Sequence, residues 1–280
     1  MRNYGLPYQG SKNQIAEEII DFLPQGNRLV DLFGGGGAIS HCASLSGKWK
    51  SILYNEYNPL VVKAFIMAIN GEFDNDNRWI DREEFNRLKD SDPYVAFAFS
   101  FSNNLLSYAY SDDSVELKKA LFYARSFHDF SYLKKLGIDC GGSLSKLRRM
   151  VDFRQQSVEA INRLRSIGKE HLTGIEIMNG SYLDYEYSEG DVVYCDPPYE
   201  NTSCGSYSGF DSQQFYDWVD SRDYQVFFSS YEISDNRFYI VFQTKKIELT
   251  SNLRGIKTEY IYSNKPYQKN NLIRKYFTFG

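Results

Sequence analysis

The sequence predicts an α/β fold in which several strands end at chemically distinctive residues. Three observations support this prediction. A strand pattern over 28–33 runs into four consecutive glycines and then a helical pattern. A second strand, over 51–54, ends in an acidic segment. A third apolar run stops at Asp196 because the two prolines that follow have no N–H to continue a sheet ladder.

Size and composition describe an ordinary globular chain. Its 280 residues, 42% of them hydrophobic, suffice for one large α/β domain or one domain with an insertion. Four scattered cysteines and three histidines argue against a structural zinc site. The chain opens without the apolar segment of a signal peptide, and its longest apolar runs are too short to span a bilayer. We therefore expect a cytoplasmic protein with free thiols, no metal and no membrane partner.

Charge is unevenly distributed along the chain. The formal net charge is −4, yet residues 118–165 carry 11 lysines and arginines against four acidic residues. This local excess of positive charge is typical of a surface that binds a polyanion. The alternative interpretation is a set of solvated helix faces.

The segment 8–12, Tyr-Gln-Gly-Ser-Lys, precedes a predicted helix over 15–22. Ser11 is placed to begin that helix, and Lys12 lies near its start. A cation in this position opposes the helix dipole, which favours a role for Lys12 in contacting an anion. An ordinary surface lysine is the alternative.

The four glycines at 34–37 form a predicted strand-to-helix turn that lets the backbone approach a ligand closely. No Gly-Lys-Ser/Thr follows, which excludes a phosphate-binding P-loop. Glu56, at the end of the second strand, is placed to accept hydrogen bonds from ribose hydroxyls. A helix-capping carboxylate before Pro59 is the alternative.

From about residue 73 to 168 the sequence is largely helical and carries the basic excess. Helix periodicity covers 114–127 and 155–167, and Asp113 with Glu116 resembles a capping box that opens the first of these helices. This part therefore has the character of an insertion into the α/β framework. The predicted divisions are 1–72 (first part of the α/β domain), 73–168 (helical insertion) and 169–280 (second part of the α/β domain).

After the insertion, strand patterns resume over 174–178, 192–195, 225–229, 238–242, 257–262 and 273–279. Asp196, the Pro197 carbonyl and the Tyr199 ring follow the second of these strands, at the carboxyl end where open α/β sheets bind ligands. The flexible composition of 201–210 predicts a lid over them. The alternative is a simple Pro-Pro turn capped by Asp196.

In this order, these segments resemble the Dam-like (D12 class) DNA N6-adenine methyltransferases, and the resemblance covers essentially the whole chain. Segment 8–12, the turn at 31–37, the insertion and the corner at 196–199 follow that group's alpha arrangement. Segments 100–104 and 199–202 are closest to phage- and prophage-type enzymes, and some members serve restriction-modification systems. The resemblance implies a class I S-adenosylmethionine-dependent methyltransferase fold, Rossmann-like, with a mixed seven-stranded sheet.

The resemblance also implies S-adenosylmethionine as cofactor. Tyr8 and Lys12 would contact its methionine end, and Glu56 its ribose. Many relatives have an acid on the cofactor's adenine where this chain has Ser181, so either Ser181 with its neighbour or Asp184 takes that place. The implied cofactor-binding residues are Tyr8, Lys12, Asp31, Phe33, Gly34, Gly36, Glu56, Ser181, Tyr182 and Asp196.

The predicted chemistry follows from the target amine. The N6 lone pair of adenine is delocalised into the ring and is a poor nucleophile. Asp196 accepting one N6 hydrogen and the Pro197 carbonyl accepting the other would favour a more tetrahedral nitrogen for direct methyl transfer. Tyr199 would stack on an adenine flipped out of the duplex. No metal and no covalent intermediate are needed.

Double-stranded DNA is the implied partner. Lys146, Arg148 and Arg149 would contact phosphates, and Asn103 and Asn104 lie in a region that reaches DNA in relatives. An asparagine can pair with adenine in the major groove. Turn residues and ordinary surface charge are the alternatives, and GATC as target is a family-level expectation only.

Other functions remain open at this point: methyl transfer to RNA adenine or another amine, a catalytically silent DNA-binding relative, and a nicotinamide oxidoreductase. Cytosine-N4 enzymes usually carry serine, and glutamine methyltransferases asparagine, at the position of Asp196, which disfavours both. The sequence does not decide whether the protein is a monomer, has a cognate restriction enzyme, or comes from a phage or a chromosome.

Overall fold

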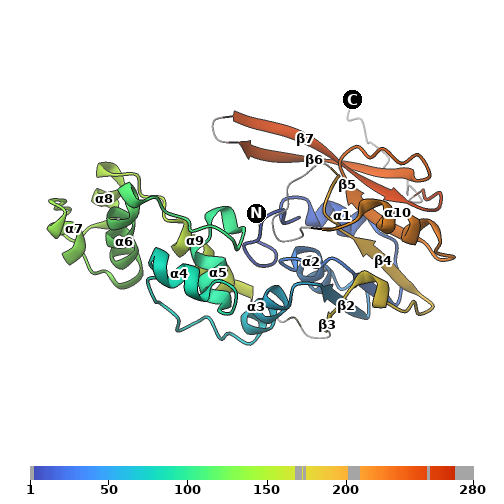
Figure 1. Cartoon of the computed structure of the whole chain (residues 1–280), viewed down its shortest axis with the longest axis horizontal. Coiled ribbons are helices and arrows are strands. Elements are labelled where there is room, and N and C mark those ends of the chain that lie inside the picture. Colours follow the sequence, from blue (N-terminus) through green and yellow to red (C-terminus); the bar gives the residue numbers. More distant parts are fainter. Residues whose placement is uncertain (1–2, 168–171, 173–174, 201–208, 251–252, 269–280) are drawn as a thin grey trace, which may run out of the picture.

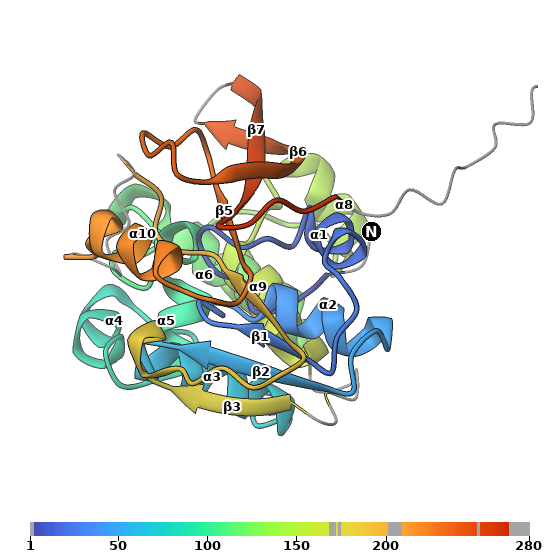
Figure 2. The ribbon, with the colours of Figure 1, turned by 90° about the vertical axis from the view of Figure 1, so that its right-hand side faces the viewer.

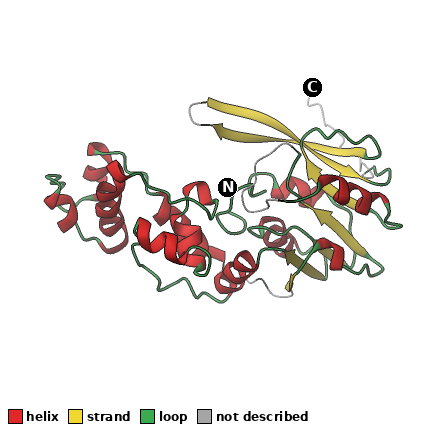
Figure 3. Ribbon diagram, viewed as in Figure 1, coloured by secondary structure: helices red, strands yellow, loops and turns green. Residues whose placement is uncertain are grey.

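The computed structural model describes residues 3–167, 172, 175–200, 209–250 and 253–268. One seven-stranded sheet lies beside a largely helical body (Figure 1; Figure 3). The strands are β1 (Arg28–Asp31), β2 (Ser51–Glu56), β3 (Ile175–Asn179), β4 (Asp191–Cys195), β5 (Val226–Ser230), β6 (Tyr239–Thr250) and β7 (Leu253–Ser263). Their order is β3-β2-β1-β4-β5-β7-β6, with β7 antiparallel to both neighbours. The expected mixed seven-stranded sheet is confirmed.

The last two described strands are longer than predicted. They pair along a hairpin from Tyr239–Ser263 to Thr250–Leu253, although β5 pairs with β7 only near the hairpin's base. In Figure 1 the hairpin extends past the other strands, on the side where the helical body lies. The predicted strand over 273–279, and residues 201–208 of the predicted lid, lie outside the described residues.

Alternating strand residues form two separate cores, one on each face of the sheet. The flanking helices are α1 (Ala16–Phe22), α2 (Ala38–Ser46), α3 (Pro59–Ile69) and α10 (Ser212–Asp220). Leu29 packs with α1 and α2, whereas its neighbour Val30 packs with α10. Figure 2 shows α10 on the side of the sheet opposite to α1 and α2. The sheet is therefore the middle of three layers.

The segment predicted to be an insertion contains helices α4 (Arg82–Leu88), α5 (Pro93–Phe99), α6 (Asp112–Phe127), α7 (Ser131–Lys135), α8 (Leu144–Met150) and α9 (Gln156–Ile167). The prediction for α9 is confirmed. The predicted capping box is wrong, because α6 begins at Asp112 with Ser111 as N-cap. No helix in the described part of the chain is long and apolar enough to cross a membrane.

The insertion packs in two parts. Helices α4, α5 and α9 share one apolar core with α3 and with Tyr54 of β2. A separate cluster, which includes Leu121, Leu133 and Leu147, joins α6, α7 and α8. The helices next to the sheet are thus fixed to it by a continuous core, and α7 and α8 lie farther out (Figure 1).

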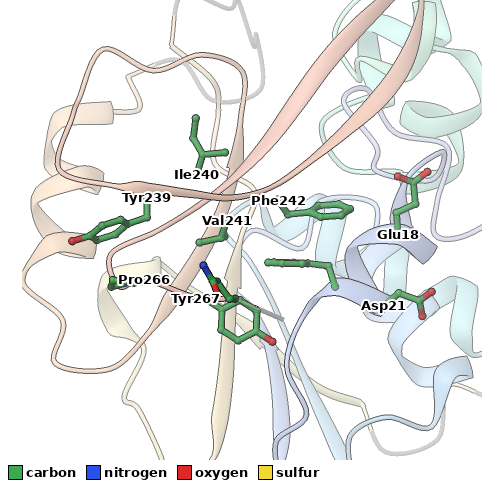
Figure 4. Close-up of a pocket in the computed structure, with 10 residues that line it drawn as sticks. Glu18, Asp21, Tyr239, Ile240, Val241, Phe242, Pro266 and Tyr267 are labelled. Atoms are coloured by element: carbon green, nitrogen blue, oxygen red, sulfur yellow. The ribbon is translucent and has the colours of Figure 1, made fainter. Parts of the chain in front are cut away.

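A pocket of about 850 Å³ lies at the β6 edge of the sheet. It is bounded by Glu18 and Asp21 of α1 on one side and by Tyr239 and Val241 of β6 on the other (Figure 4). The predicted site residues do not line this pocket; Asp31, Glu56 and Asp196 lie at the carboxyl ends of the parallel strands.

Candidate active site

The glycine-rich turn after β1 is fastened to β2. The N–H of Gly34 donates to the Asn55 carbonyl at 2.7 Å, and the Tyr54 hydroxyl donates to the Gly35 carbonyl at 2.8 Å. A Cβ at position 34 would lie 2.2 Å from the Tyr54 ring. Glycine is therefore required at Gly34 by the packing of β2 beneath the turn, in addition to any approach of a ligand.

The N-terminal segment lies against the same turn. The N–H of Leu6 donates to the Gly36 carbonyl at 2.6 Å, and a Cβ on Gly36 would meet the Leu6 carbonyl and the Tyr8 Cβ at 2.9 Å. The Tyr8 ring covers Gly35, whose added Cβ would lie 3.4 Å from it. The structure thus brings the predicted residue Tyr8 onto the predicted glycine turn.

Three predicted carboxylates share one edge of the sheet. Strand β1 pairs in parallel with β2 on one side and with β4 on the other, placing Asp31 beside Tyr54 and Tyr194. Glu56 ends β2, and Asp196 immediately follows β4. The two residues that the sequence assigned to the methyl donor and the target amine therefore flank the same strand end.

Glu56 is buried and already binds the backbone. Its Oε2 accepts from the Gly35 N–H and its Oε1 from the Asn58 N–H, both at 2.8 Å. Asn58 is the N-cap of α3. Glu56 therefore supports both the glycine turn and the start of the helix, as the helix-capping interpretation expects, and its contact with a ribose stays a prediction.

Asp31 is buried and accepts a hydrogen bond from the Ser40 hydroxyl at 2.8 Å. Burial raises the pKa of Asp31 to about 7, and the negative charges of Asp196 and Glu56 add to the rise. A carboxyl whose folded pKa exceeds its unfolded value binds more protons in the folded state.

We expect the stability of the protein to fall as pH rises from about 4 to about 7, and Asp31→Asn to remove much of this slope, since the amide does not ionise. Urea unfolding midpoints at several pH values measure this. Parallel curves for wild type and variant would contradict the assignment of the shift to Asp31.

Asp196 is held by a lysine and a serine. The Lys12 ammonium lies 2.5 and 2.6 Å from the two carboxylate oxygens, and the Ser229 hydroxyl of β5 donates to Oδ1 at 2.8 Å. Lys12 is 4% exposed. Burial opposes its charge, but the carboxylates of Asp196 and Glu259 outweigh that effect and raise the pKa of Lys12. In this structure Lys12 therefore contacts the predicted catalytic carboxylate.

A second buried carboxylate, Glu259 of β7, joins this group. Its Oε1 lies 3.3 Å from the Lys12 ammonium and accepts from the Tyr199 hydroxyl at 2.8 Å. The Tyr199 ring packs edge-on against Tyr231, and the ammonium lies 4.9 Å from the ring centre. Tyr199 is thus fixed at both its hydroxyl and its ring.

The predicted adenine-contacting residues lie beside an aromatic cluster. The ring of Phe33 stacks on that of Tyr182 at 5.3 Å and meets Phe215 edge-on. Ser181 and Asp184 are bound to each other in a capping box at the 3₁₀ turn Tyr182–Asp184. Phe33 and Tyr182 therefore belong to one apolar cluster of packed rings, and the choice between Ser181 and Asp184 stays open.

The predicted DNA-binding residues fall into two groups. The Asn103 carbonyl accepts from the Gln9 N–H at 3.2 Å, which places this turn beside segment 8–12. The Asn103 side chain, however, donates to the Phe97 carbonyl. The Asn104 side chain accepts from the N–H groups of the next turn. Both asparagine side chains thus form hydrogen bonds that stabilise the local backbone. Lys146, Arg148 and Arg149 are exposed on α8.

Sequence reasoning missed two residues of the site, Ser229 and Glu259. Ser229 lies on β5, whose five residues are all buried, and Glu259 lies on β7; no sequence motif marks either of them. It also assigned Arg163 to the basic excess, whereas its guanidinium donates to the carbonyls of residues 4–6. Part of the positive charge of the insertion therefore serves to hold the N-terminal segment.

The seven-stranded mixed sheet, with carboxylates at the carboxyl ends of its parallel strands, has the class I methyltransferase fold. The model of the family described as D12 class N6 adenine-specific DNA methyltransferase matches residues 8–277, and the chain belongs to this family. It is also 25% identical over 240 residues to Modification methylase LlaI from Lactococcus lactis subsp. lactis. That match covers 75% of this chain and 32% of the relative, so the chain spans about a third of the relative's length.

Two solved structures align along most of the chain, with low scores. PH1948 from Pyrococcus horikoshii, described as a putative RNA methyltransferase, has a TM-score of 0.40 at 11% identity, covering 94% of this chain and 92% of that one. HI0767 from Haemophilus influenzae, described as a putative methylase, has a TM-score of 0.33 at 14% identity, covering 92% and 91%. The family assignment does not depend on either.

Proposed function

We propose that the protein transfers a methyl group from S-adenosylmethionine to N6 of an adenine flipped out of duplex DNA. One observation carries the proposal: Glu56 ends β2 and Asp196 directly follows β4, and these two strands flank β1, so a donor held at one residue and an acceptor held at the other would meet. Membership of the D12 family supports the choice of adenine and DNA.

The residues at this edge fit S-adenosylmethionine. The ligand has a sulfonium, an ammonium and two ribose hydroxyls, so it offers positive charge and hydrogen-bond donors. The edge offers the complementary groups: Asp31, Glu56 and Asp196, and the buried Asn55 Oδ1, which has no hydrogen-bond partner among the described residues. When bound, the cofactor would supply the electrophilic methyl group.

The chain's own residues would orient the target amine. Asp196 would accept one N6 hydrogen, and the Pro197 carbonyl would accept the other, which localises the lone pair toward the methyl donor. Ser229 would fix the rotation of the Asp196 carboxylate through its 2.8 Å hydrogen bond. The Tyr199 ring would stack on the base. The cluster of apolar rings around Phe33 would exclude water on the cofactor side.

The basic surface of α8 would hold the duplex backbone. We expect Lys146→Ala and Arg149→Ala each to weaken DNA binding, and each to reduce the slope of log K against log salt by about 0.9, since each removes one phosphate contact. Fluorescence anisotropy at several salt concentrations measures both effects.

Lys50→Ala is the matched control, because Lys50 is exposed before β2, outside the insertion. It should change neither affinity nor slope. If the α8 variants behave like Lys50→Ala, the duplex does not lie on α8.

The function is tested by the product. Genomic DNA from cells that express the protein should contain N6-methyladenine in one short sequence, detected by modified-base sequencing. Purified protein should transfer labelled methyl groups to duplexes that contain this sequence. Label found only in RNA, or in another base, would replace the proposal with another amine methyltransferase. If the protein still binds DNA but no labelled methyl group is transferred, the protein is a catalytically silent DNA-binding relative.

A further inference from the structure

Glu259 is a buried acid whose contacts are incomplete. It is 1% exposed, and its Oε1 accepts a hydrogen bond from the Tyr199 hydroxyl and forms an ion pair with the Lys12 ammonium. Its Oε2 is buried and has no hydrogen-bond partner in the part of the chain that the structure describes. Burying a carboxylate oxygen without a partner costs free energy, so a native structure that keeps one there calls for an explanation.

Lys12 occupies the place that a substrate needs. Its ammonium bridges both oxygens of Asp196 and also lies over the Tyr199 ring. An adenine whose amino group donates to Asp196, and whose ring stacks on this face of Tyr199, would meet the ammonium at both contacts. A neutral amine is also a weaker ligand for a carboxylate than a charged ammonium. Substrate therefore needs a second acceptor for Lys12.

We propose that Glu259 is a positioning residue that receives the Lys12 ammonium when the target amino group enters against Asp196. This inference rests on the proposed function. The ammonium is already 3.3 Å from Glu259 Oε1, and Oε2 lies on the same carboxylate. Rotation of the flexible lysine side chain completes the exchange without moving a proton or breaking a covalent bond.

The exchange has two consequences for Asp196. Lys12 stays paired with a buried carboxylate throughout, so no isolated charge is created. Asp196 loses its counter-ion and becomes a stronger acceptor for the N6 hydrogen. The Tyr199 hydroxyl and Ser229 hold Glu259 and Asp196 in their orientations while Lys12 moves.

Glu259→Gln keeps the shape of the side chain and removes its charge. We expect single-turnover methyl transfer to fall by about 10- to 100-fold, with DNA affinity at fixed salt within about twofold of wild type. Glu259→Asp retains the charge and should recover part of the rate. Glu189→Gln, exposed before the start of β4, is the matched control and should transfer at the wild-type rate.

A spectroscopic readout separates exchange from a merely structural role. The protein is labelled with ¹³C at lysine Cε, and the Lys12 resonance is assigned with Lys12→Met. In the presence of S-adenosylhomocysteine, a duplex that contains the target sequence with an unmethylated adenine should shift this resonance in wild type. The same duplex should leave the resonance unchanged in Glu259→Gln. A duplex with purine, which lacks the amino group, in place of the target adenine should shift it in neither protein.

The outcomes distinguish this inference from the proposed function. Equal shifts in both proteins, no shift in wild type, or wild-type transfer by Glu259→Gln would each overturn the exchange while methylation by wild type stands. If wild type methylates no adenine in any duplex, the proposed function fails first, and the exchange fails with it.

Discussion

Asp196→Ala should lower single-turnover methyl transfer by at least about 10³-fold, because it removes the acceptor for the N6 hydrogen. Affinity for duplex DNA at a fixed salt concentration should change by less than about twofold, since phosphate contacts on the insertion supply most of it. Quenched-flow assays with labelled S-adenosylmethionine measure the first effect and anisotropy the second.

Asp196→Asn addresses the concern that alanine disturbs folding. The amide has the size of the carboxylate but offers one acceptor and one donor, and its NH₂ opposes the Lys12 ammonium 2.5 Å away. It should be impaired nearly as much as the alanine variant. Asp223→Asn, exposed before β5, is the control and should retain activity. Transfer that survives in both Asp196 variants would disprove the assigned role.

Glu56→Gln should weaken S-adenosylmethionine binding by about 100-fold. The carboxylate would accept two ribose hydroxyls, and hydrogen bonds to a charged group contribute about 1.5–3 kcal/mol each. Glu56 also accepts the N–H groups of Gly35 and Asn58, so the variant loosens the glycine turn as well. Isothermal titration calorimetry gives the dissociation constant.

Glu83→Gln on α4, an exposed acid, is the matched control and should bind as wild type does. NAD provides a second comparison, because a dinucleotide oxidoreductase would also place an acid at this strand end. Binding of NAD in preference to S-adenosylmethionine would revive that class. Unchanged affinity in Glu56→Gln would place the cofactor elsewhere.

The sequence predicted most of the α/β framework because its signals are local. Glycines at 34–37 and the prolines after Asp196 fix where β1 and β4 end, and the carboxyl ends of parallel strands meet by geometry. The helix start at Ser111 was missed because Asp113 and Glu116 imitate a capping box two residues too late. Local signals of this kind place an element more reliably than its boundary.

The contacts of the site could not be read in the same way. Ser229 and Glu259 meet Asp196 and Lys12 only because β5 lies next to β4 and β7 lies next to β5 in the sheet, and that order is a tertiary property. Likewise, Lys12 was expected at an anion, but the sequence could not show that the contacting anion in this structure is Asp196. Asn104 was expected to read DNA, but its side chain accepts a hydrogen bond within its own turn. The sequence does not distinguish a turn asparagine from a DNA-reading one.

A crystal structure with S-adenosylhomocysteine and a duplex that contains the methylated sequence tests the central claim most directly. We predict that the target adenine lies outside the duplex stack, with N6 within hydrogen-bonding distance of Asp196 and the Pro197 carbonyl, and that the ribose hydroxyls of the cofactor product lie on Glu56. An adenine amine remote from Asp196, or a cofactor bound away from Glu56, would contradict the account.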